Sequence, residues 1–155
     1  MLTPRFKDFL DSNGVKYTSI PHRTAYTAME IAESAHVRGQ EMAKTVIVEL
    51  DGKLAMAVLP ATKHVGLDRL GSSVGARHVE IAKEGEFRYD FPDCEVGAMP
   101  PFGNLFNMDV YVDPRLAEDE EIAFNAGSHT ELIRLAYKDF QRLVKPKAVR
   151  LAYGE

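Results

Sequence analysis

A glycine- and proline-rich loop is the segment best suited to chemistry on a carbonyl group. It reads Gly97-Ala98-Met99-Pro100-Pro101-Phe102-Gly103-Asn104. Prolines fix the backbone angle φ, and glycines let a backbone approach a ligand closely. A rigid loop of this kind can aim the N–H groups of Gly97, Ala98 and Met99 at a carbonyl oxygen or an oxyanion. The alternative left open by these residues is an ordinary rigid turn.

A second loop and one lysine are the other candidates. The loop Asn125-Ala126-Gly127-Ser128-His129-Thr130 offers backbone amides, a hydroxyl and an imidazole together. A simple Gly-Ser turn with a surface histidine explains the same residues. Lys44 comes directly before the apolar segment 45–50. A lysine beside a buried strand either extends its ammonium to solvent or meets an anion.

Other familiar chemistries lack the residues that they need. The sequence holds neither a phosphate-binding Gly-x-x-x-x-Gly-Lys-Ser/Thr loop nor a dinucleotide-binding Gly-x-Gly-x-x-Gly pattern. No metal-ligating spacing such as His-x-His or His-Glu-x-x-His occurs among the histidines His22, His36, His64, His78 and His129. We therefore expect no metal site. We interpret Cys94, the single cysteine, as a small buried hydrophobe rather than a nucleophile.

Composition and charge set the class of protein. The 155 residues are 45% hydrophobic and 27% charged, which predicts one globular domain over residues 1–155. We expect a cytoplasmic location and no membrane partner, because no apolar run approaches about 20 residues and no signal-peptide core is present. The net charge of −4 argues against a protein that coats nucleic acid. One C-terminal basic run predicts at most a local, weak contact, or else a solvated surface: Lys138, Arg142, Lys145, Lys147 and Arg150.

Short helices and strands are predicted in mixed order. A first helix is expected from Pro4 towards Gly14, with Thr3 as its N-cap. Further helices are expected after the capping-box pattern Thr27-Ala28-Met29-Glu30 and at 67–74, 83–89 and 138–144. Strands are expected at 15–20, 45–50, 53–59, 78–82, 110–112, 122–125, 131–136 and 148–152. Asp51-Gly52 between two of them predicts a hairpin. The order favours an α+β fold around a mixed, largely antiparallel sheet.

The three candidate segments together resemble the YbaK/prolyl-tRNA-synthetase-associated (INS-like) editing domain family. The resemblance covers about residues 5–149, and its parts come in the family's order. The matching stretches are Ala43-Lys44-Thr45-Val46-Ile47-Val48, Gly97-Ala98-Met99-Pro100-Pro101-Phe102-Gly103, Phe124-Asn125-Ala126-Gly127-Ser128-His129 and the helix start Tyr137-Lys138-Asp139-Phe140. It implies a strongly bent β-sheet with flanking helices. It also implies a stand-alone trans-editing aminoacyl-tRNA deacylase, which hydrolyses the ester bond of mischarged tRNA.

The resemblance also implies roles for single residues. Lys44 corresponds to the family's active-site lysine, and the amides of Gly97, Ala98 and Met99 would hold the aminoacyl carbonyl. The substrate-binding residues implied are Thr24, Tyr26, Pro100, Pro101, Gly127, Ser128 and His129. Neither a metal ion nor a cofactor is implied, and the ribose hydroxyl of the substrate would help to activate the attacking water. Whether His129 acts chemically or only lines the pocket stays open.

The expected partner is aminoacyl-tRNA, bound through its 3′-terminal aminoacyl-adenosine. Transient association with an aminoacyl-tRNA synthetase or a translation factor would help to select the tRNA. The edited amino acid stays open among alanine, proline, serine, cysteine and threonine. The alternative function is a non-catalytic module that senses an amino acid, an aminoacyl-adenylate-like ligand or a nucleotide in the same pocket. The presence of both Lys44 and the full Gly97–Pro101 loop argues against it.

Overall fold

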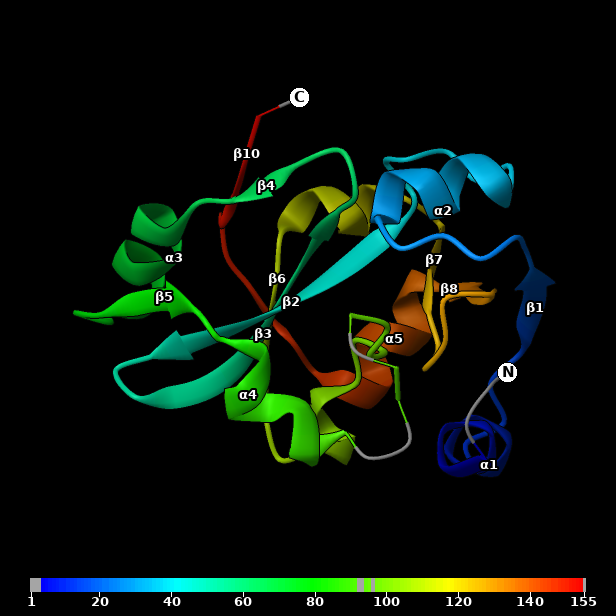
Figure 1. Ribbon diagram of the computed structural model, residues 1–155, viewed down its shortest axis with the longest axis horizontal. Coiled ribbons are helices and arrows are strands. Elements are labelled where there is room, and N and C mark those ends of the chain that lie inside the picture. Colours follow the sequence, from blue (N-terminus) through cyan, green and yellow to red (C-terminus); the bar gives the residue numbers. More distant parts are fainter. Residues whose placement is uncertain (1–3, 92–93, 96, 155) are drawn as a thin grey trace.

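A long hairpin, β2 (Ala43–Leu50) and β3 (Lys53–Pro60), runs through the centre of the molecule (Figure 1). The computed structural model describes residues 4–91, 94–95 and 97–154. Asp51 and Gly52 form the hairpin turn with φ values of +49° and +87°. Positive φ at both central residues is what the twist of a two-residue hairpin requires, so the Asp-Gly prediction is confirmed.

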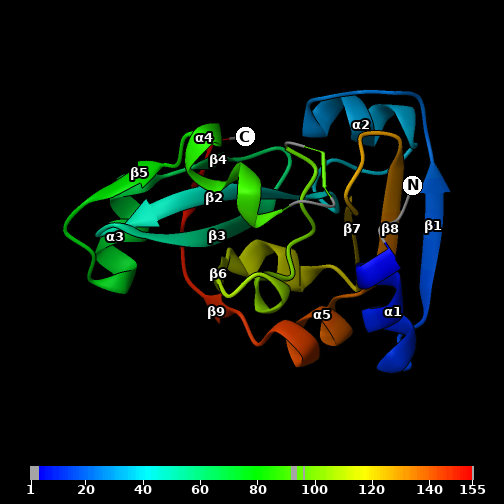
Figure 2. The same ribbon diagram turned by 60° about the horizontal axis from the view of Figure 1, so that its bottom comes forward.

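The hairpin belongs to a five-stranded mixed sheet of order β5-β2-β3-β6-β9. Here β5 (Val79–Ile81) is antiparallel to β2, β6 (Asp109–Val112) is parallel to β3, and β9 (Lys147–Ala148) is parallel to β6. A second, antiparallel sheet orders β1 (Tyr17–Pro21), β8 (Glu131–Ala136) and β7 (Glu121–Asn125). Figure 2 shows this second sheet at one end of the molecule, with the hairpin turn at the other. The predicted mixed α+β fold is confirmed.

Five α-helices are assigned within the described residues. They are α1 (Pro4–Ser12), α2 (Ala28–Ser34), α3 (Leu67–Val74), α4 (Glu84–Phe87) and α5 (Tyr137–Val144), with 3₁₀ turns at Arg88–Asp90, Gly103–Leu105 and Pro114–Glu118. The Thr27 hydroxyl accepts the N–H of Glu30 at 3.1 Å, which confirms the predicted start of α2. The N-cap predicted at Thr3 lies outside the described residues. None of these helices is long and apolar enough to cross a bilayer.

The C-terminal strand predicted at 148–152 is wrong. That segment holds two separate short strands, β9 and β10 (Ala152–Tyr153), and β10 pairs with a strand that the sequence did not indicate, β4 (His64–Val65). The buried Asp113 carboxylate accepts the N–H groups of Leu151 at 3.3 Å and Ala152 at 3.0 Å. Asp113, which directly follows β6, therefore accepts N–H groups that a continuous strand would donate to a neighbouring strand.

The main core centres on Phe102, which follows Pro101 in the candidate loop. Its ring lies 4.9 Å from Phe6, 5.7 Å from Phe124, 5.7 Å from Phe140 and 6.0 Å from Phe9, measured between centroids. These partners come from α1, β7 and α5, so one side chain joins three elements. Phe102 is fully buried, which ties the end of the loop to the core.

We expect Phe102→Ala to lower the free energy of unfolding by about 3–5 kcal/mol, because it leaves a cavity among four aromatic rings. For a chain of this length, that corresponds to a fall in Tm of roughly 6–20 °C. The measurement is thermal unfolding followed by circular dichroism. Tyr153→Ala is the control, because that ring is 48% exposed and its removal should shift Tm little. Equal shifts for the two variants would contradict the central role of Phe102.

Candidate functional site

A small hollow lies where the start of β2 meets the end of β7 and the Gly97 loop. Its volume is about 150 Å³, and its lining residues are Tyr26, Ala43, Lys44, Thr45, Gly97, Met99 and Asn125. A parallel bridge between Met42 and Ala123 joins the two sheets beside it. We call it the Lys44 hollow. It brings together four predicted site residues, Lys44, Gly97, Met99 and Tyr26, from three distant segments.

Three hydrogen bonds connect Glu95 and the first candidate loop to the second candidate loop. The Glu95 N–H donates to the Gly127 carbonyl and the Gly127 N–H donates to the Ala98 carbonyl, both at 2.8 Å. The Glu95 carboxylate accepts the backbone N–H of His129 at 3.0 Å. Glu95 was not predicted as a site residue. Its only sequence signal is an acidic side chain two residues before Gly97.

One of the three predicted amide donors is not available. The N–H of Ala98 donates to the Glu95 carbonyl at 3.0 Å inside a tight turn, and the Ala98 side chain is fully buried. The expectation that this amide can bind a substrate is therefore corrected for this conformation. The N–H groups of Gly97 and Met99 meet no hydrogen-bond acceptor in the part of the chain that the structure describes. The loop therefore offers two donors rather than three.

Several other predicted residues lie behind the wall of the Lys44 hollow or outside it. Pro100 and Pro101 are buried beside Phe102, and Gly127 and Ser128 are buried in the second loop. Thr24 is exposed and is not among the lining residues. None of these five residues is among the described residues that line the hollow.

His129 supports the wall from behind. Its side chain is 6% exposed, and the Tyr26 ring lies against it with 4.9 Å between centroids. A β-carbon built on Gly97 would lie 3.6 Å from His129 Cε1, so the loop backbone passes directly over the imidazole. The Ala25 N–H donates to the His129 carbonyl at 3.3 Å, which fixes the segment that carries Tyr26. The ring of Tyr26 itself is 71% exposed at the rim.

Lys44 is a half-buried cation without an ion pair in the described chain. Burial lowers the pKa of its ammonium from the usual 10.5, because desolvation disfavours the charged form. An anion in the hollow would offset that cost. Across the same hollow, the Asn125 Oδ1 atom is buried and has no hydrogen-bond partner among the described residues. One uncompensated cation and one residue with an unsatisfied acceptor therefore line the hollow, which suits a polar ligand.

Within residues 4–91, 94–95 and 97–154, no cluster of three histidine, cysteine or acidic side chains is placed to hold a metal ion. Cys94 is half-buried and packs against the main core. Among the described residues, Lys44, backbone amides and neutral polar side chains line the hollow.

Comparisons with known proteins converge on one family. The model of the aminoacyl-tRNA editing domain matches residues 22–143. The multifunctional Ser/Thr-tRNA deacylase ProXp-y of Escherichia coli K12 is 26% identical over 145 residues, which cover 90% of this chain and 86% of that protein.

Two solved structures share the fold. A hypothetical protein superposes with a TM-score of 0.85 and 18% identity over 96% of this chain and 99% of its own. A candidate trans-editing enzyme for prolyl-tRNA synthetase superposes with a TM-score of 0.83 and 21% identity over 99% of this chain and 100% of its own. The fold is therefore that of known proteins of similar size.

We expect Gly97→Ala to destabilise the protein and to disturb His129. Gly97 has φ = +85°, which costs a residue with a β-carbon about 1–2 kcal/mol. The added methyl group would meet the imidazole at an ordinary contact distance, so backbone strain rather than a clash is the cause. Urea unfolding and the NMR shifts of the His129 ring measure the two effects.

Gly14→Ala is the matched control. Gly14 has φ = +67°, and a β-carbon there would meet no atom within 4 Å. It should lose a similar amount of stability while leaving the His129 signals unchanged. If the Gly97 variant left the His129 signals unchanged as well, the loop would not be held against the imidazole in solution.

Proposed function

The chain belongs to the aminoacyl-tRNA editing domain family, and from this we propose that it is a stand-alone trans-editing deacylase acting through the Lys44 hollow. The observation that carries the proposal is Lys44 itself. Its half-buried ammonium has no ion-pair partner in the described chain and shares a hollow with two loop residues whose amides lack acceptors. A polar, partly anionic ligand would satisfy these groups together.

The proposed reaction is hydrolysis of the ester between the amino acid and the terminal ribose of tRNA. Water attacks the carbonyl carbon, the bond to the ribose oxygen breaks, and that oxygen takes a proton. The N–H groups of Gly97 and Met99 stabilise the negative charge that develops on the carbonyl oxygen, each by about 3–4 kcal/mol in comparable sites. Lys44 holds the phosphate or ribose of the terminal adenosine.

Among the described residues that line the Lys44 hollow, none carries a carboxylate or an imidazole. The lining thus lacks the usual general bases, and we propose that the ribose hydroxyl beside the ester helps to orient and activate the water. His129 takes a supporting role in this scheme, because Gly97 and Tyr26 cover it.

For the amino acid, we propose serine and threonine. The hollow is small, and the buried Asn125 Oδ1 atom would accept a hydrogen bond from a side-chain hydroxyl. The relative from Escherichia coli is named a Ser/Thr-tRNA deacylase, which supports the same choice. A site that uses a buried polar group to bind a hydroxyl rejects analogues without one far better than a difference in size allows.

The proposal treats residues 1–155 as one editing domain. It includes a transient synthetase or translation-factor partner, because a hollow of about 150 Å³ receives only the charged end of a tRNA. The choice of tRNA then depends on contacts elsewhere. The alternative, a module that only senses an aminoacyl ligand, predicts binding without release of the amino acid.

We expect Lys44→Ala to lower kcat/KM for mischarged tRNA by about 30- to 5,000-fold, because a desolvated charge contact contributes about 2–5 kcal/mol. Lys44→Arg should recover little, since the planar guanidinium places its charge differently. The assay is release of free amino acid from charged tRNA, with and without EDTA, and EDTA should have no effect. Hydrolysis at the wild-type rate by Lys44→Ala would remove this lysine from the reaction.

The stability of a further variant, Lys44→Met, separates chemistry from folding. The folded protein releases the Lys44 proton at a lower pH than the unfolded chain does. The wild type should therefore gain stability relative to Lys44→Met as pH rises from the lowered pKa towards 10.5. At neutral pH the wild type and Lys44→Met should have the same Tm, or Lys44→Met should have a slightly higher one. A large loss of stability at neutral pH would mean that Lys44 has a structural role.

We expect Asn125→Ala to lower the preference for serine. With one tRNA charged either with serine or with alanine, kcat/KM should fall about 5- to 150-fold for the seryl ester, which corresponds to one buried hydrogen bond of about 1–3 kcal/mol. The value for the alanyl ester should change little. An unchanged ratio between the two esters would show that Asn125 does not read the hydroxyl group.

A further inference from the structure

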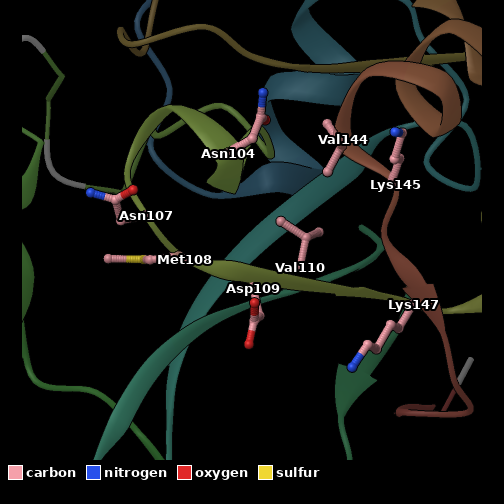
Figure 3. A pocket seen from close by; sticks show the side chains of 8 residues that line it. All are labelled: Asn104, Asn107, Met108, Asp109, Val110, Val144, Lys145 and Lys147. Atoms are coloured by element: carbon pink, nitrogen blue, oxygen red, sulfur yellow. The ribbon is translucent and has the colours of Figure 1, made fainter.

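A second hollow lies on the surface between the 3₁₀ turn Gly103–Leu105, the start of β6 and the end of α5 (Figure 3). Its volume is about 400 Å³, and it shares no lining residue with the Lys44 hollow. We call it the Lys145 hollow. Its polar lining residues are Asn104, Asn107, Asp109, Lys145 and Lys147.

The Lys145 hollow carries a net positive charge on a chain whose net charge is −4. Lys145 and Lys147 are exposed and form no ion pair within the described residues. The single carboxylate of the lining, on Asp109, lies 3.5 Å from the ammonium of Lys53, which offsets its charge. Figure 3 shows the two lysines along one side of the hollow and Asn107 on the other. Cationic and amide donors thus line one concave surface.

One stretch of backbone connects the two hollows. Gly97 and Met99 line the Lys44 hollow, and Asn104 lines the Lys145 hollow five residues further on. Even a fully extended chain of that length spans at most about 18 Å. The intervening Pro100, Pro101 and Phe102 are buried, so the spacing between the hollows is held by the core. The backbone positions of Met99 and Asn104, one at each hollow, therefore lie within about 18 Å of each other.

We propose that the Lys145 hollow binds the sugar–phosphate backbone of tRNA next to its charged 3′ end. Lys145 and Lys147 contact phosphate oxygens, and the amides of Asn104 and Asn107 donate hydrogen bonds to ribose hydroxyls or phosphates. Lysine–phosphate and amide–2′-hydroxyl contacts are the usual means by which proteins hold RNA irrespective of its sequence. The inference rests on the proposed function, which supplies an RNA ligand for the neighbouring hollow.

The test is the double variant Lys145→Gln/Lys147→Gln. Binding to uncharged tRNA is measured by fluorescence anisotropy over a series of salt concentrations. Each phosphate contact contributes about 0.7–0.9 to the slope of log K against log salt. Loss of two contacts should therefore reduce the magnitude of that slope by about 1.4–1.8. KM for charged tRNA should rise about tenfold or more at low salt while kcat stays unchanged.

Lys16→Gln/Arg77→Gln is the matched control, because it removes two positive charges from exposed side chains that line neither hollow. Its slope should equal that of the wild type. Asn104→Ala should weaken binding without changing the slope, since it removes no charge. Lys145 follows α5 with φ = +52°, so its replacement should lower Tm by no more than about 4 °C. The single variant Lys147→Gln leaves Lys145, the C-cap residue of α5, in place. It should reduce the magnitude of the slope by half as much as the double variant.

Hydrolysis of aminoacyl-adenosine separates this proposal from the proposed function. That small ester reaches only the Lys44 hollow, so the double lysine variant should cleave it at the wild-type rate. If the wild type cleaves aminoacyl-adenosine but the slopes of wild type and double variant agree, the Lys145 hollow does not bind RNA. If the wild type cleaves neither aminoacyl-adenosine nor charged tRNA, the deacylase function fails, while the slopes still decide whether the hollow binds tRNA.

Discussion

The hydrogen bonds between the Gly97 loop and the Gly127 loop are the constraint on which the candidate site depends. Glu95 bonds to the second loop through both its N–H and its carboxylate, and Gly127 returns a bond to Ala98. With Glu95, Ala98 and Gly127 bonded in this way, the amides of Gly97 and Met99 meet no acceptor among the residues that the structure describes. The same bonds set the imidazole of His129 beneath the loop. Preorganised donors of this kind need no rearrangement when charge develops on a substrate.

Core packing offsets the free-energy cost of this arrangement. A loop with two unsatisfied amides and a lysine with a lowered pKa persist only if the surrounding structure holds them. Phe102 provides that support, because its ring lies in the second half of the loop and packs against α1, β7 and α5. The bridge between Met42 and Ala123 fixes the start of β2 against β7 and so places Lys44 opposite Asn125. The geometry of the site therefore depends directly on the packing of the core in this protein.

The two hollows along the segment from Gly97 to Asn107 differ in size, burial and charge, and these properties suit different parts of the proposed substrate. The first is small, with neutral polar groups and one half-buried cation, and suits the reacting ester. The second is wider, exposed and basic, and suits a flexible polyanion. Desolvation strengthens single contacts in the first, whereas salt screens those in the second. In the proposed scheme, chemistry and RNA affinity can then be altered separately, even though one loop contributes to both hollows.

Much of the fold was set by local residue patterns. The Asp51-Gly52 turn, the capping of α2 by Thr27 and the helix at 67–74 depend on neighbours along the chain, so the sequence by itself determined them. It also indicated Lys44, Gly97, Met99 and Tyr26 as site residues, through residue type and family resemblance.

Tertiary structure alone decided the remaining features. The N–H of Ala98 is taken up by Glu95, and the buried Oδ1 of Asn125, a residue that lines the Lys44 hollow, is left without a partner among the described residues. Asp113 captures the amides of Leu151 and Ala152 and divides the last strand in two. Each outcome depends on which groups meet across long stretches of chain, because a buried donor or acceptor pairs with whatever partner the packing brings within about 3 Å. Residue patterns report local preference, and they do not reveal which distant group will take a given hydrogen bond.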